Sequence, residues 1–134
     1  MPKNRNFFCK YERICSNKEK EQIFLSNNKK SFLPFFCRYS FLEYNDYFLK
    51  IIIIVPKKKI RKANIRNTLK RLIREAYRLN NSILKESLKA KNLFLLLSIT
   101  YTNSELLTYQ EIEKGIIEFF NFIINKIDNG IQNS

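Results

Sequence analysis

Two largely apolar segments, residues 47–56 and 92–101, most constrain what this chain can fold into. The first reads YFLKIIIIVP and is rich in β-branched residues, and the second reads NLFLLLSITY. Runs without polar alternation are typical of strands that are buried on both faces. They are much shorter than the roughly 20 apolar residues that a membrane-spanning helix needs. We therefore expect a covered sheet rather than a membrane protein.

Capping signals mark two of the helices that would cover such a sheet. Ser16 with Glu19, and Thr108 with Glu111, have the spacing of capping boxes, which satisfy the free N–H groups of a first helical turn. They predict a helix that ends near residue 26 and another that ends near Lys126. The apolar residues of the helix that begins after Thr108 recur at helical spacing, which is typical of a face packed in the core. They are Ile112, Ile116, Phe119, Phe120, Ile123, Ile124 and Ile127.

The remaining elements complete a single domain. Residues 35–42 are aromatic-rich and predict a third strand, with a turn at 43–46. Helices are expected from about Ala63 and again over about 82–90. The order predicts an α+β domain, residues 1–134, with three or four strands and helices packed on the sheet. Residues 1–10 lack the long apolar run of a signal peptide, and the sequence leaves open whether they are ordered.

Positive charge is concentrated in residues 57–78, KKKIRKANIRNTLKRLIREAYR. Ten of these residues are Lys or Arg and one is an acid, Glu75, so the segment carries +9 of the chain's net +13. A helical projection separates it into an apolar face, which should pack on the sheet, and a cationic face. The apolar face holds Ile65, Leu69, Leu72, Ile73, Ala76 and Leu79.

The cationic face is better explained by a bound polyanion than by solvation alone. Like charges four residues apart repel by a few tenths of a kcal/mol per pair, and a solvated face normally mixes signs. Arginine strengthens this interpretation, because a guanidinium group can bind phosphate oxygens bidentately. We therefore predict contacts with nucleic acid through one set of residues. The set is Lys57, Lys58, Lys59, Lys62, Arg66, Asn67, Lys70, Arg71, Arg74 and Arg78.

No residues suited to protein-borne catalysis stand out. The chain has no His, and its three cysteines, Cys9, Cys15 and Cys37, lack zinc-ligand spacing and a basic partner. The two glycines, Gly115 and Gly130, cannot form a glycine-rich phosphate loop. If the protein belongs to an enzyme, we expect a partner to carry the chemistry.

Residues 62–80, KANIRNTLKRLIREAYRLN, resemble the signature of the bacterial ribonuclease P protein component, which reads roughly K-A-V-x-R-N-R-[IV]-K-R-x-x-R-E. Both flanks are similar to that family too, with VPKKK before the motif and YTNSELLTYQEIEKGI after the last strand. The resemblance covers about residues 10–127. The matching positions of the signature are Lys62, Ala63, Arg66, Asn67, Lys70, Arg71, Arg74 and Glu75.

The resemblance implies a fold of its own. It is an α-β sandwich of α-β-β-β-α-β-α type with a left-handed βαβ crossover, like a split domain of a ribosomal protein. This order has one strand more than the residue pattern indicates. Residues 30–42 could supply the additional strand, or Pro34 could split that region.

The resemblance also implies a function in tRNA processing. The protein would be a subunit of a cytoplasmic ribonucleoprotein, one protein per catalytic RNA. That endoribonuclease is a hydrolase that removes the 5′ leader of precursor tRNA. The RNA would carry the catalysis and hold most of the Mg²⁺ on its phosphates, and the basic helix would dock on this RNA. A separate cleft between the first helix and the sheet would bind the leader by stacking and charge. Its candidates are Phe24, Phe36, Tyr39 and Phe41, each of which could equally be a core residue.

Three positions depart from the family pattern. Thr68 stands where an Arg is usual, Arg61 where a Gly is frequent, and Lys20 where the first helix usually offers an apolar or aromatic residue. Their effects on RNA affinity and leader recognition are left open.

Two other functions fit the basic helix. One is a non-catalytic RNA-binding protein, such as a ribosomal or RNA-assembly protein. The other is a peripheral membrane protein, which is disfavoured because the apolar face of the helix should be covered by the sheet.

Overall fold

A computed structural model of the chain describes residues 13–14, 16–43 and 47–130. Residues 1–10, Cys15 and positions 44–46 of the expected turn lie outside this part. The elements follow one another as α1 (Asn17–Phe24), β1 (Lys29–Phe32), β2 (Phe35–Leu42), β3 (Leu49–Ile54), α2 (Ala63–Asn80), α3 (Ser82–Lys91), β4 (Phe94–Tyr101) and α4 (Tyr109–Asp128). The α+β class is confirmed, as are the three strands and the helices predicted from the residues.

The four strands form one sheet in the order β1-β2-β4-β3. β2 pairs antiparallel with β1 and with β4, whereas β3 and β4 are parallel. Pro34 lies between β1 and β2, so region 30–42 contains the additional strand and is also split by the proline. The parallel pair β3 and β4 is connected through α2 and α3, as a βαβ crossover requires, and the left hand of this crossover stays a prediction.

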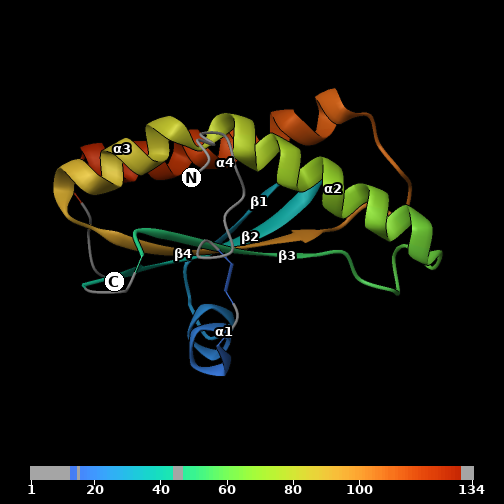
Figure 1. Cartoon of the computed structure of the whole chain (residues 1–134), viewed down its shortest axis with the longest axis horizontal. Coiled ribbons are helices and arrows are strands. Elements are labelled where there is room, and N and C mark those ends of the chain that lie inside the picture. The colour runs from blue at the N-terminus through green and yellow to red at the C-terminus, as the bar shows by residue number, and fades with distance from the viewer. Residues whose placement is uncertain (1–12, 15, 44–46, 131–134) are drawn as a thin grey trace, which may run out of the picture.

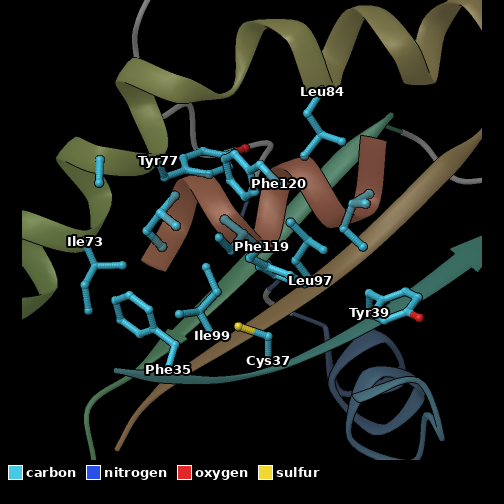
Figure 2. Close-up of a cluster of buried hydrophobic side chains, with 14 of the residues drawn as sticks. Phe35, Cys37, Tyr39, Ile73, Tyr77, Leu84, Leu97, Ile99, Phe119 and Phe120 are labelled. Carbon is cyan, nitrogen blue, oxygen red and sulfur yellow. The ribbon is translucent and has the colours of Figure 1, made fainter. Parts of the chain in front are cut away.

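The sheet lies between two unequal helical layers. α2, α3 and α4 lie on one side of it, and α1 lies alone on the other (Figure 1). The larger core cluster fills the space under the three helices and includes Phe35, Leu97, Ile99 and Phe119 (Figure 2). The smaller cluster, between α1 and the sheet, consists of Ile14, Ile23 and Leu96 with Leu42 and Ile52 packed against it.

α4 packs tightly on the β1–β2 hairpin. The predicted capping box is present, because the Thr108 hydroxyl accepts from the Glu111 N–H while the Glu111 carboxylate accepts from the Thr108 N–H. The predicted apolar stripe is buried, except that Ile124 is half-buried. Gly115 lies in this stripe, and a Cβ there would stand 2.9 Å from the carbonyl oxygen of Leu33. Glycine therefore allows the helix and the hairpin turn to approach each other closely.

α1 is tied to the sheet by a shielded ion pair. The Ser16 hydroxyl caps the helix by accepting from the Glu19 N–H. The Glu19 carboxylate binds Lys50 of β3, with 3.0 Å between Lys50 Nζ and Glu19 Oε2, and both side chains are at most 14% exposed. The acid of this predicted capping box is therefore used to hold α1 against the sheet.

The buried face of α2 differs from the predicted one at two positions. Leu79 was assigned to the apolar face but is 45% exposed, whereas Tyr77 is completely buried although it projects among the cations. The reason is α4, which the helical projection does not include. The Tyr77 ring packs edge-on against Phe120 of α4, with 6.0 Å between ring centroids. The buried face of α2 therefore includes Tyr77, whose ring lies beside Phe120 of α4 (Figure 2).

Candidate nucleic-acid interface

The segment between β3 and α2 presents three consecutive lysines on a fixed turn. The Pro56 carbonyl accepts from the N–H groups of Lys59 and Ile60, and the Ile60 side chain is 4% exposed. The side chains of Lys57, Lys58 and Lys59 are exposed. The turn is therefore anchored by its apolar residue while its charges face solvent.

Arg66 fastens this turn to the helix. One of its guanidinium nitrogens, Nη1, donates to the carbonyl oxygens of Ile60, at 2.9 Å, and of Arg61, at 2.8 Å. Arg66 was predicted to contact nucleic acid, and in this geometry part of its hydrogen-bonding capacity is used within the chain. Arg66 therefore has a structural role, which is separate from the predicted contact with nucleic acid.

The first turn of α2 adds to the positive potential. It contains no acid, and its N-cap residue, Lys62, makes no side-chain capping hydrogen bond to the N–H groups of the first turn. These N–H groups carry the positive end of the helix dipole, which favours anions. The other predicted residues of α2 follow along the helix. Asn67 and Arg71 are exposed, and Lys70, Arg74 and Arg78 are half-buried.

Two of the arginines have charged neighbours, one on the same helix and one from a distant part of the chain. Arg78 forms an ion pair with Glu75, one turn away, so this acid neutralises the carboxyl end of the basic face. Partial burial, and then the nearby charge of Arg13, lower the pKa of the Arg74 guanidinium. Arg13 pairs with Ile51 of β3 and so reaches the helix from 61 positions earlier in the chain. No local signal in the sequence could have placed it there.

The three departures from the family pattern have different surroundings. The Thr68 hydroxyl donates to the Asn64 carbonyl at 3.0 Å, so it is turned onto its own helix. Arg61 is exposed and supplies one of the carbonyls that Arg66 binds. Lys20 is half-buried on α1.

The four predicted cleft aromatics do not share one surface. Side chains alternate along β2, and Tyr39 and Phe41 lie on the side of α2, α3 and α4, where Tyr39 is 7% exposed. The Tyr39 ring packs edge-on against Phe41 and Phe122, and burial raises the pKa of its hydroxyl. Figure 2 shows Tyr39 across β2 from α1. Tyr39 and Phe41 are therefore core residues, and assigning them to the cleft beside α1 was wrong.

Phe36 and Phe24 have positions that suit the α1 side. Phe36 is half-buried, and its side chain lies on the opposite side of β2 from that of Tyr39. Phe24 is 39% exposed at the carboxyl end of α1. The Arg38 guanidinium carbon lies 5.6 Å from the centroid of the Phe36 ring, within reach of a cation–π contact. Arg38 also donates to the Ser26 carbonyl, at 3.1 Å, just after α1. It was missed because a single charge in a strand gives no signal of its own.

The sheet register relates Phe36 and Arg38 to the turn that holds Lys57, Lys58 and Lys59, which we call the lysine turn. Phe36 is opposite Thr100 of β4, which is opposite Ile54, the last residue of β3. Lys57 follows Ile54 by three residues. One end of the sheet therefore holds the Phe36 ring, the Arg38 guanidinium group and the three lysines. It is the end at which β2 begins and β3 and β4 end.

These groups can bind anions and unpaired bases, but they offer little for acid–base chemistry. Within residues 13–14, 16–43 and 47–130, no three His, Cys, Asp or Glu side chains gather in a way that could hold a metal ion. In the same ranges, no helix is long and apolar enough to cross a membrane. Cys37 is buried in the core, which raises the pKa of its thiol.

The chain is similar in sequence to named proteins. Two relatives named ribonuclease P protein component, from the ATCC 33277 and W83 strains of Porphyromonas gingivalis, are each 31% identical over 74 residues. The match covers 55% of this chain and 54% of each relative, so the chain spans about half the length of the relatives it matches.

Solved structures share the fold. The Staphylococcus aureus RNase P protein superposes with a TM-score of 0.64 at 22% identity, covering 84% of this chain and 94% of that one. A mutant of that protein, described as defective in mRNA degradation activity, superposes with a TM-score of 0.67 at 21% identity, covering 85% and 89%. The sequence model of the family described as Ribonuclease P matches residues 8–123. The chain belongs to the ribonuclease P protein family.

Proposed function

We propose that this protein is the protein subunit of a ribonuclease P ribonucleoprotein and promotes removal of the 5′ leader from precursor tRNA. Membership of the family is the observation that carries the proposal, and the basic surface at the amino end of α2 supports it. The partner RNA performs the hydrolysis, and Mg²⁺ is held mainly by RNA phosphates. The protein contributes charge and positioning.

The chain's own groups act in two places. The lysine turn and the cations of α2 dock on the catalytic RNA, where they neutralise phosphates and release counterions. The surface beyond α1, with Phe36 and Arg38, holds an unpaired base of the leader by stacking and charge. Because Lys57 to Lys59 lie at the same end of the sheet, both RNA segments are held side by side.

Reconstitution tests the proposal. The protein is mixed with a bacterial ribonuclease P RNA, and cleavage of precursor tRNA is followed at low Mg²⁺. We expect faster leader removal with the protein than without it, because its cations reduce the repulsion between RNA phosphates. If the protein binds RNA but leader removal is not accelerated, the chain is a non-catalytic RNA-binding protein instead.

A matched pair of variants tests the docking face. Lys70→Ala with Arg71→Ala removes two predicted phosphate contacts and leaves Arg66 to hold the lysine turn. We expect weaker binding of the catalytic RNA, with a salt dependence whose logarithmic slope is reduced by roughly 1.5. Lys91→Ala with Lys114→Ala removes the same charge from exposed positions on α3 and α4 and should leave the slope nearly unchanged. Equal slopes for the two double variants would exclude α2 as the docking face.

A further inference from the structure

A pocket between α3 and the first residues of β3 and β4 lies apart from the surfaces described above. It has a volume of about 280 Å³ and is lined by Tyr47, Phe48, Leu49, Lys85, Lys89 and Phe94. This volume is just under the roughly 300–1,000 Å³ of sites for drug-sized ligands, so the pocket suits a single ring system.

The pocket combines flat aromatic surface with positive charge. Phe48 and Phe94 stack in parallel, with 4.9 Å between their ring centroids and 3° between their planes. Tyr47 and Phe48 are half-buried, so a ligand can reach the rings of these two residues from solvent. Lys85 and Lys89 are one turn apart on α3 and line the same pocket, and both basic residues in the last turn of α3, Lys89 and Lys91, are exposed. Aromatic rings beside ammonium groups match a nucleotide, whose base can stack while its phosphate pairs with a lysine.

The pocket is too far from the lysine turn to be part of the same contact. It lies at the amino end of β3, whereas Lys57 follows the carboxyl end, and β3 has six residues. At about 3.3 Å per residue, the two ends of the strand are roughly 20 Å apart. Figure 1 likewise shows α3 and the amino end of α2 at opposite ends of the molecule.

We infer that this pocket binds one unpaired nucleotide of an RNA strand, with the base against Phe48 and Tyr47 and the phosphate at Lys85 and Lys89. The occupant is single-stranded, because a base within a duplex has no free face to offer. The inference adds to the proposed function a second RNA contact at the far end of the sheet, and in that respect it rests on the proposed function.

Two lysines of α3 provide the test. Lys89→Glu changes a residue that lines the pocket, and Lys91→Glu makes the same change at an exposed residue of the same helical turn outside it. The probe is a fluorescein-labelled single-stranded oligoribonucleotide, and binding to the full chain is followed by anisotropy. We expect Lys89→Glu to weaken binding at least about fivefold more than Lys91→Glu. Equal losses of affinity in the two variants would overturn the inference, because both variants would then act only through the change in net charge.

A second variant and a crosslink address the aromatic side. Phe48→Leu keeps an apolar side chain but removes the ring, and binding should weaken about fivefold or more while the thermal unfolding midpoint confirms a folded protein. An oligonucleotide that carries 4-thiouridine should form adducts in the peptide that contains Tyr47 and Phe48. Adducts confined to other peptides would overturn the inference.

Failure of the pocket and failure of the proposed function can be told apart. If the reconstituted enzyme removes leaders while Lys89→Glu and Lys91→Glu behave alike, the pocket is excluded and the proposed function stands. If leader removal is not stimulated but the crosslink maps to the pocket, the pocket stands as an RNA site of a protein with a different task. A wild-type protein that does not bind the oligonucleotide overturns the pocket.

Discussion

The two faces of the sheet are built from alternate residues of the same strands, yet they differ in almost every physical respect. Under α2, α3 and α4 the face is apolar and continuous, with Cys37, Ile51 and Leu97 completely or almost completely buried. On the α1 side, the apolar cluster is small, and this side also holds Lys50, which pairs with Glu19, and Arg38, which donates to the Ser26 carbonyl. One face therefore carries most of the burial that stabilises the fold, and the other leaves polar and aromatic groups within reach of a ligand.

The sharpest way to separate the two faces is a pair of phenylalanine truncations. Phe119→Ala removes a completely buried ring from the larger core and should lower the free energy of unfolding by about 3–5 kcal/mol. Phe36→Ala removes a half-buried ring from the α1 side and should cost less than about 1.5 kcal/mol. Urea unfolding of both variants measures the difference. Equal losses would mean that the α1 side contributes to stability as the larger core does.

The ion pair on the α1 side should also matter for stability, because it is shielded from water. Lys50→Met leaves the Glu19 carboxylate without the ammonium group that binds it and should destabilise the protein by about 3 kcal/mol. Glu19→Gln in the same chain should restore much of this loss, since it removes the uncompensated charge. Chemical denaturation of the single and double variants forms the required cycle. A double variant no more stable than Lys50→Met would show that the cost of shielding an unpaired Glu19 carboxylate from water is not the cause.

The larger core should respond to alkaline pH through Cys37. Burial raises the pKa of this thiol above its ordinary value of 9.0, so above about pH 9 the folded chain retains a proton that the unfolded chain loses. Stability present at lower pH is then lost as pH rises, by about 1.4 kcal/mol per pH unit for one group. Cys37→Ala should flatten the fall in unfolding free energy above about pH 9. An unchanged slope would assign the fall to other groups, among which Tyr39 and Tyr101 also have a raised pKa.

The smallest effect concerns leader recognition. In the reconstituted enzyme, Phe36→Ala should weaken binding of precursor tRNA about fivefold relative to tRNA without a leader, because one stacking contact is lost. Phe41→Leu is the matched control on the opposite face and should leave this ratio unchanged. A ratio that shifts equally in both variants would remove Phe36 from the leader surface.

The sequence predicts those features of the fold that depend on neighbouring residues. The Thr108 capping box and the buried stripe of α4 depend on spacings of three or four residues, and both are present. The failures concern contacts between distant segments. Tyr77 is buried because Phe120 of α4 packs against it, and a projection of α2 alone places it among the cations.

The candidate site shows the same division. The basic face of α2 can be predicted from composition and periodicity, whereas Arg13 reaches Arg74 only through the fold. Tyr39 and Phe36 are both aromatic residues of one strand, and alternation alone cannot decide which of them faces α1. That choice depends on which side of the sheet the three helices cover, which is a property of the whole chain.

The two hydrogen bonds from Arg66 to the carbonyls of Ile60 and Arg61 have a kinetic consequence. Fixing the backbone of one residue costs about 1–2 kcal/mol of conformational entropy, and for the lysine turn this loss is incurred during folding rather than on binding. The encounter with RNA then needs no ordering step in this segment. Its rate should be set by diffusion and by electrostatic steering, and it should fall steeply as ionic strength rises.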